Sequence, residues 1–366
     1  MESLINNKKI IYILIYLVFF LAGDVLFSNF IYKKKIQHNC YKNMKNFFQL
    51  QKNCYAKEKW VRNVNSYDVY TDENGFRFSG KKKEIENDVK IAAFFGDSFT
   101  YGMGLDYNKT FVGLIENEKK EFNILNLGVP GYSPTVFNYQ LKQIIQNGII
   151  PSKIFFVLDI SDVSEEASQW DIKDGYDQPV QINQAIGKDQ NIEEEEKSFI
   201  DENFKGSRFI ARSVNNFFRS FRLYLSSFKK KPEKAGYSGW GNFLYMDLNE
   251  TDKNLWEPFG FDEGINKIKK NSKEIANLAK SVNAELYIVI YPWPDSLEYG
   301  QNKFNWENFS KELCNNIQCT KLINFFPEFD DIKKKHSNWL TKIYIGGDLH
   351  LTEYAQKIIA NKLLKE

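Results

Sequence analysis

The chain has 366 residues, of which 43% are hydrophobic and 16% are aromatic. This composition supplies a substantial buried core and excludes an intrinsically disordered protein. The formal net charge of +2 gives no strong positive field of the kind that draws a protein to nucleic acid. We therefore expect a globular protein without a nucleic-acid partner, built as one large domain with insertions or as two smaller ones.

The first predicted element is an apolar segment near the N-terminus. Residues 10–32 follow a short polar tail, residues 1–9, and form an almost unbroken run of hydrophobic side chains. As a helix this run is about 33 Å long, which is enough to cross a bilayer. It lacks a small-residue cleavage site, so the sequence predicts an uncleaved transmembrane signal anchor. The alternative is a helix buried in a protein core.

Two features of the sequence predict opposite sides of the membrane for the rest of the chain. Lysines at 33–35 oppose translocation under the positive-inside rule. The cysteines favour it, because Cys40 and Cys54 flank one short segment and Cys314 and Cys319 flank another. An even count in two local pairs is typical of disulfides in an oxidising compartment. We therefore predict an extracytoplasmic domain, periplasmic or on the outer face, with free cytosolic thiols as the alternative.

A regular alternation of strands and helices begins at residue 90. Residues 33–89 show no clean alternation and are interpreted as a stalk with a short lead-in that packs on the domain. Beyond them, alternating strands and helices predict a parallel sheet covered by helices on both faces. Ligands bind such sheets beyond the carboxyl ends of the strands. Strands are expected at 91–95, 122–127, 153–158, 285–291 and 322–325, and helices at 110–119, 134–147, 265–282, 306–314 and 352–364.

The alternation fails between about residues 164 and 260, which we interpret as an insertion in a domain of residues 90–366. Residues 171–205 are polar and acidic, and we expect a loop there. Residues 207–228 have the spacing of an amphipathic helix with phenylalanines and arginines. A lid helix packed on the domain is favoured over a helix lying on an anionic membrane surface.

The strongest chemical signal is the motif Gly-Asp-Ser at residues 96–98, directly after the first predicted strand. Ser98 would lie at the carboxyl edge of the sheet, near free backbone N–H groups. A serine hydroxyl needs a base to act as a nucleophile. Of the three histidines, only His350 lies in a plausible place, just before the last predicted helix, and Asp348 can orient its ring. An ordinary turn serine and a lone turn histidine are the alternatives.

These residues resemble the signature blocks of the SGNH, or GDSL-type, hydrolase superfamily, over about residue 90 to the end without the insertion. The resemblance implies a flavodoxin-like three-layer α/β/α sandwich with a parallel sheet. It gives Ser98 the role of nucleophile and His350 that of general base. An Asn-x-x-x-x-Gly block matches residues 126–131, so the backbone N–H groups of Gly131 and Ser98 would bind the oxyanion.

The chain departs from the family pattern at two places. Ser161 stands where the family has an asparagine that completes the oxyanion hole, and its hydroxyl is the candidate third donor. Loss of one such donor typically costs about 100- to 1000-fold in rate. The family aspartate is usually three residues before the histidine, whereas Asp348 is only two residues before His350. Envelope polysaccharide acetyltransferases of the superfamily also use an Asp-x-His pair.

Trp293 follows another predicted strand, where its ring could bind a sugar or an acyl chain, or could belong to the core. The sequence has no zinc-finger cysteine spacing, P-loop or dinucleotide fingerprint, so no metal or cofactor is expected.

The sequence thus predicts a membrane-tethered serine esterase or O-acyltransferase acting on ester-linked acyl groups, with acetyl groups of cell-envelope carbohydrate favoured. Two alternatives remain, a lipase or lysophospholipase near the membrane and a non-catalytic glycan-binding protein on a degenerate hydrolase fold. Nothing in the sequence indicates an oligomeric state.

Overall fold

The structure is a computed structural model that describes residues 2–26, 39–44, 46–60, 65–81, 89–172, 178–182, 256–301 and 304–366. The N-terminal helix α1 spans Glu2–Leu26 and is described by itself. Among the described residues, none of the helices combines the length and the apolar character that a bilayer crossing requires. The predicted anchor continues past Leu26 to residue 32, and its end lies outside the described residues.

The rest of the described chain is a mixed α/β fold with a central, largely parallel sheet of eight strands. Its five parallel strands run in the spatial order β7-β6-β8-β11-β12, which is the 2-1-3-4-5 order of flavodoxin-like sheets. The predicted parallel sheet is therefore confirmed. The parallel strands are β6 (Lys90–Phe95), β7 (Phe122–Asn126), β8 (Lys153–Leu158), β11 (Glu285–Ile290) and β12 (Lys321–Asn324).

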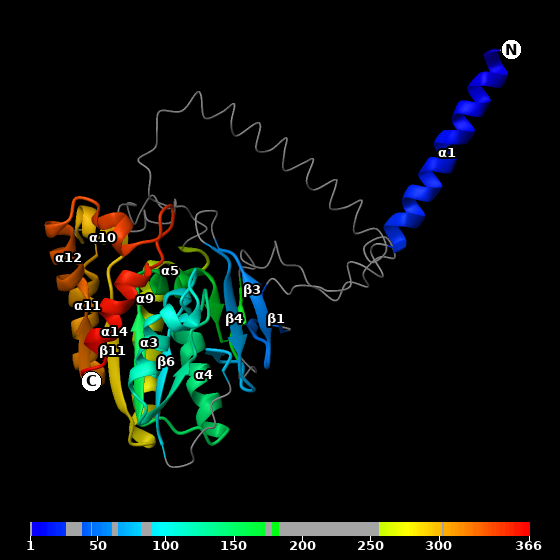
Figure 1. The fold of residues 1–366 in the computed structure, drawn as a ribbon. Coiled ribbons are helices and arrows are strands. Elements are labelled where there is room, and N and C mark those ends of the chain that lie inside the picture. The colour runs from blue at the N-terminus through cyan, green and yellow to red at the C-terminus, as the bar shows by residue number, and fades with distance from the viewer. Residues whose placement is uncertain are drawn as a thin grey trace. The chain divides into compact units, whose positions relative to one another are not determined.

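Helices cover both faces of this sheet (Figure 1). On one face α3 (Phe111–Glu118) contacts the C-terminal helix α14 (Glu353–Leu363). On the other face α9 (Phe261–Ser281) contacts its neighbours α4 (Pro134–Gln146), α5 (Ser161–Ser168) and α11 (Trp306–Ile317). The shorter helices are α2 (Ser98–Tyr101), the 3-10 turn η2 (Tyr107–Lys109), α10 (Pro294–Tyr299), α12 (Phe326–Lys335) and α13 (Trp339–Ile343).

The central strands carry apolar side chains on both faces of the sheet, and many of these side chains are aromatic. In β8, Phe155 faces the α3 side, where its ring stacks on that of Phe94 at 4.4 Å and lies 4.9 Å from that of Tyr287. The next residue, Phe156, faces the other side and meets Phe137 of α4 edge to face. Successive strand residues point to opposite faces, so a strand buried on both faces needs a continuous apolar run.

The predicted lead-in to the domain is more extensive than expected, because strands before residue 90 belong to the main sheet. Strands β3 (Tyr55–Glu58), β4 (Tyr67–Thr71) and β5 (Arg77–Phe78) form an antiparallel meander that extends the main sheet beyond β7. Strands β1 (Tyr41–Asn43) and β2 (Phe48–Leu50) form a separate hairpin. These strands are only two to five residues long, too short for their alternation to stand out in the sequence.

A buried charge network joins this meander to the turn that carries Ser98. Glu58 is buried and accepts hydrogen bonds from the hydroxyls of Tyr67, at 2.8 Å, and Tyr101, at 3.0 Å. Burial raises the pKa of Glu58, while these two hydrogen bonds and the charge of Arg77 oppose that rise. The Arg77 guanidinium donates to the carbonyls of Gly102 at 3.0 Å and Leu105 at 2.6 Å. The N-terminal strands therefore form one folded unit with the α2 turn.

The insertion is shorter than predicted at its N-terminal boundary. Residues 161–168 form α5, which packs against α9, and β9 (Trp170–Asp171) pairs with β10 (Val180–Gln181). The predicted amphipathic helix at 207–228 lies outside the described residues, as does most of the predicted loop at 171–205.

Both predicted local cysteine pairs form disulfides, Cys40 with Cys54 and Cys314 with Cys319. They close loops of 14 and 5 residues. Chain entropy predicts stabilisation by about 3 kcal/mol for the longer loop and about 2 kcal/mol for the shorter one.

We therefore expect replacement of both Cys40 and Cys54 by alanine to lower the free energy of unfolding more than replacement of both Cys314 and Cys319. Urea unfolding under non-reducing conditions measures the difference, and wild-type stability of the first double variant would contradict it.

Candidate active site

The first residue of α2 is Ser98, which the end of strand β6 delivers to the carboxyl edge of the sheet. Asp97 caps the helix, because its carboxylate accepts a hydrogen bond from the N–H of Phe99 at 2.9 Å. Gly102 ends the helix with φ of 85°, a left-handed conformation that glycine adopts without strain. Ser98 is half-buried at the start of this tight turn.

His350 lies in the loop between α13 and α14, directly opposite Ser98. Its Nε2 is 2.8 Å from the Oγ of Ser98, and its Nδ1 is 2.7 Å from the Oδ2 of Asp348. Backbone contacts hold the loop, because the N–H of Ile345 donates to the carbonyl of His350 at 2.8 Å. The structure thus brings the three predicted residues into one hydrogen-bonded chain, although Ser98 and His350 are 252 positions apart.

The charge of Asp348 is stabilised by its neighbours. Burial opposes ionisation of this side chain, which is 5% exposed. Hydrogen bonds from His350, from the N–H of Leu349 and from Trp60, together with the electrostatic interaction with His350, outweigh burial and hold the pKa of Asp348 below its ordinary value. His350 is also buried, at 6% exposed. An ionised carboxylate on one side of the ring and a hydroxyl on the other is the arrangement that lets an imidazole accept a proton from a serine.

The sequence interpretation missed Trp60. This residue follows β3, within the segment interpreted as a stalk, and its indole N–H donates to the Oδ2 of Asp348 at 2.7 Å. Its ring also meets that of His350 edge to face, with 5.5 Å between the centroids. No motif marks Trp60 in the sequence, because the contact joins segments 288 residues apart.

Gly131 lies in the loop between β7 and α4, with φ of 77°. Its carbonyl accepts a hydrogen bond from the indole N–H of Trp170 at 2.8 Å. Among the residues that the structure describes, none accepts a hydrogen bond from the N–H of Gly131. The fold therefore fixes the carbonyl of Gly131, while its N–H has no acceptor among the described residues.

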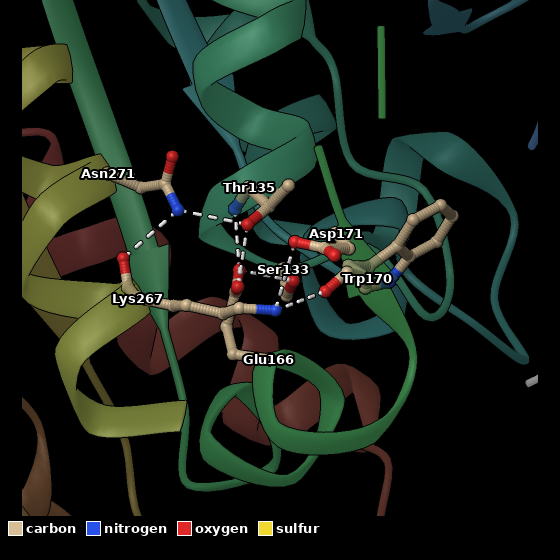
Figure 2. A network of polar contacts seen from close by, with 7 residues as sticks. All are labelled: Ser133, Thr135, Glu166, Trp170, Asp171, Lys267 and Asn271. Atoms are coloured by element: carbon tan, nitrogen blue, oxygen red, sulfur yellow. Dashed lines mark hydrogen bonds and ion pairs between the residues drawn. The ribbon is translucent and has the colours of Figure 1, made fainter. Parts of the chain in front are cut away.

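A polar network fixes the start of α4, three residues further along (Figure 2). The buried carboxylate of Glu166 accepts hydrogen bonds from the hydroxyls of Ser133, at 2.7 Å, and Thr135, at 2.6 Å. It also accepts one from the N–H of Thr135 at 2.5 Å. Burial raises the pKa of Glu166, and these hydrogen bonds limit the rise.

Helix α9 completes this network (Figure 2). The side chain of Asn271 donates to the hydroxyl of Thr135 at 2.9 Å. Lys267 donates to the carbonyl of Trp170 at 2.7 Å and lies 3.5 Å from the carboxylate of Asp171. Because Trp170 also donates to the carbonyl of Gly131, the network connects α9 to the loop that contains Gly131.

Ser161 does not offer the hydrogen bond that the sequence interpretation gave it. Its hydroxyl donates to the Oδ1 of Asp159 at 2.6 Å, and its N–H donates to the same oxygen at 2.7 Å. A hydroxyl has one proton to donate, and here that proton is already used within the protein. The carboxylate that accepts both hydrogen bonds lies only two residues before Ser161 in the chain. Ser161 is therefore left out of the oxyanion hole proposed below.

Several buried carboxyl groups lie together beneath the nucleophile. Asp159 also accepts a hydrogen bond from the hydroxyl of Tyr291 at 2.7 Å. Burial, followed by repulsion from neighbouring carboxylates, raises the pKa values of Asp97, Asp162 and Glu165 well above the ordinary range. Within the described residues, no group of histidine, cysteine, aspartate or glutamate side chains is arranged to hold a metal ion.

Trp293 lies immediately before α10 and is only 4% exposed. Its ring stacks on that of Phe99 at 6.3 Å, and Phe99 in turn lies 5.0 Å from the ring of His350. Trp293 therefore packs behind the site as a core ring, and the half-exposed aromatic beside His350 is Trp60, at 46% exposed.

The chain is similar to several solved structures of esterases and lipolytic proteins. One is a member of the lipolytic protein G-D-S-L family from Veillonella parvula, with 13% identity, a TM-score of 0.41, and coverage of 76% of this chain and 97% of that one. A second is LAE5, an α/β hydrolase from the metagenome of Lake Arreo in Spain, with 12% identity, a TM-score of 0.41, and coverage of 77% and 95%. A third is the acetylxylan esterase Axe2 from Geobacillus stearothermophilus, with 9% identity, a TM-score of 0.41, and coverage of 77% and 95%.

No protein-family model and no curated protein matches the chain. Its function is therefore inferred below from the geometry of the site.

The raised pKa of Glu165 predicts how stability depends on pH. A carboxyl group whose pKa is raised on folding favours the folded state while it is protonated, and this contribution is lost as the pH rises through the raised pKa. We expect Glu165→Gln, which cannot ionise, to raise the free energy of unfolding by on the order of 1 kcal/mol in mildly alkaline buffer. The gain should vanish as the pH falls to 4.5, the ordinary carboxyl value.

Urea unfolding across this pH range measures the effect. Glu312→Gln, at an exposed position on α11, is the matched control and should show no such pH-dependent gain. A Glu165→Gln variant that is equally destabilised at every pH would contradict the prediction.

Proposed function

We propose that the protein is a serine esterase or O-acyltransferase that transfers acyl groups through Ser98. The observation that carries the proposal is the continuous hydrogen-bonded chain from Asp348 through His350 to Ser98, with contacts of 2.7 and 2.8 Å. A serine, a histidine and a carboxylate in this order are the parts that acyl transfer requires, whatever fold presents them.

In the proposed reaction, His350 Nε2 takes the proton of the Ser98 hydroxyl while Oγ attacks the ester carbonyl. The carbonyl oxygen of the tetrahedral intermediate becomes negatively charged, and the N–H groups of Gly131 and Ser98 are its proposed donors. His350 then gives its proton to the departing alcohol, which leaves an acyl group on Ser98. Asp348 holds the ring and stabilises its positive charge while it carries the proton.

The second half of the reaction decides between the two activities. If His350 activates water, the acyl-enzyme is hydrolysed and the protein is an esterase. If it activates a hydroxyl of a sugar, the protein is an O-acyltransferase. Nothing in the triad distinguishes these acceptors, because each presents an O–H group to the same base.

We further propose that the substrate is an acylated, most simply acetylated, carbohydrate of the cell envelope. Supporting this, the half-exposed ring of Trp60 lies beside His350, and sugar rings pack well on aromatic faces. The two disulfides fit the proposal that the domain lies outside the cytoplasm, tethered by residues 10–32.

The mechanism predicts that single substitutions abolish ester hydrolysis. Ser98→Ala removes the attacking atom and His350→Ala removes the base, so each should lower kcat for p-nitrophenyl acetate by about a millionfold or to background. Asp348→Asn retains the size of the side chain but not its charge, and should cost about ten-thousandfold. Initial rates of the full-length protein give these values, and unfolding curves show whether each variant is folded.

The same assay separates the alternatives. Greater turnover of long-chain than of acetyl esters would favour the lipase. Wild-type turnover no higher than that of Ser98→Ala on p-nitrophenyl acetate and on acetylated oligosaccharides would contradict the proposal and favour the glycan-binding protein.

The proposed tether predicts that the full-length protein remains with membranes washed in alkaline carbonate. A variant that begins at residue 33 should be released, because it lacks the apolar segment. Immunoblotting of the pellet and supernatant measures this, and release of the full-length protein would contradict the tether.

A further inference from the structure

We propose that Trp60 is a positioning residue for the triad: its indole N–H holds Asp348, and through it His350, in the orientation that proton transfer requires. This inference rests on the proposed function and extends it to a residue outside the sequence motifs. It makes the N-terminal strands part of the active site.

Trp60 and His350 both contact the same carboxylate oxygen of Asp348. The Oδ2 of Asp348 accepts from the Trp60 indole at 2.7 Å and lies 2.7 Å from His350 Nδ1. Two donors that converge on one carboxylate oxygen fix the rotation of the Asp348 side chain, which a single donor leaves free to swing. The edge-to-face contact of the two rings, 5.5 Å between centroids, restrains His350 from a second direction.

Trp60 is itself held in place by the fold. It lies two residues after Glu58, whose buried carboxylate accepts hydrogen bonds from the hydroxyls of Tyr67 and Tyr101. Tyr101 is the last residue of α2, the helix that begins at Ser98. Glu58 therefore ties the end of β3 to the nucleophile turn, while Trp60 reaches the acid of the triad. The disulfide between Cys40 and Cys54 restrains the chain just before this strand.

Packing alone does not account for this arrangement. Trp60 is 46% exposed, whereas Asp348 is 5% exposed. A half-exposed ring contributes little core burial, but its N–H supplies a hydrogen bond to a buried carboxylate. Such a bond to a charged acceptor is stronger than one between neutral groups. We therefore expect the contact to affect catalysis more than stability.

The test compares Trp60→Phe with the wild type in the full-length protein. Phenylalanine keeps an aromatic ring and removes the N–H. We expect kcat for p-nitrophenyl acetate to fall about tenfold, which corresponds to the free energy of one charge-assisted hydrogen bond, while KM stays unchanged.

In the Asp348→Asn background, Trp60→Phe should have a smaller effect on kcat, because Trp60 acts through the carboxylate. Trp339→Phe, a half-buried tryptophan on α13 that contacts Tyr344, is the matched control and should leave kcat unchanged.

An NMR measurement tests the contact without using turnover. The indole N–H signal of Trp60, identified by its absence in Trp60→Phe, should shift in Asp348→Ala and not in Trp339→Phe. If that signal does not move, the contact with Asp348 is absent and the positioning role is overturned. If Trp60→Phe raises KM and leaves kcat unchanged, the positioning role is also overturned, and Trp60 acts in substrate binding alone. Absence of turnover in the wild type, with the signal shift intact, would instead overturn the proposed function, and with it any role of Trp60 in catalysis.

Discussion

The contact between His350 and Ser98 is the interaction on which the rest of the site depends. It spans 252 positions of sequence, and the fold must place both side chains within 2.8 Å. Ser98 is positioned by the end of β6, a central strand whose apolar side chains are buried on both faces. His350 is positioned by the loop before α14, a helix that packs against α3. The parallel strands make this possible, because their carboxyl ends all lie at one edge of the sheet.

Electrostatics sets the second constraint on the site. A cluster of buried carboxyl groups, among them Asp97 and Glu165, lies next to the nucleophile turn, and burial favours their neutral forms. Asp348, which contacts Nδ1 of His350, is also buried, but hydrogen bonds from His350, the N–H of Leu349 and Trp60 lower its pKa and favour the charged form. The carboxyl groups near the nucleophile turn therefore favour the neutral form, while Asp348 favours the charged form that supports proton transfer. The network around Glu166 in turn fixes the start of α4 and the loop of Gly131.

The N-terminal strands contribute residues that contact the nucleophile turn and the triad. Glu58 connects β3 to α2, and Trp60 connects the same segment to Asp348. A segment interpreted from sequence as a stalk with a short lead-in thus contributes strands to the sheet and contacts the triad. This arrangement explains why the folded domain begins well before residue 90, where the alternation of strands and helices becomes visible.

The sequence by itself predicted the five parallel strands, five of the helices of the domain, the two local cysteine pairs and the candidate residues Ser98, Asp348 and His350. These features can be recognised in short stretches of sequence, because long apolar runs indicate buried segments and short motifs indicate tight turns. Only the tertiary structure decided that Ser161 donates to Asp159, that Trp293 is buried and that Trp60 holds Asp348. The first depends on where one hydroxyl points, and the other two depend on contacts between segments far apart in the chain. Composition and spacing carry no information about such contacts, since they arise only when the sheet brings its strand ends together.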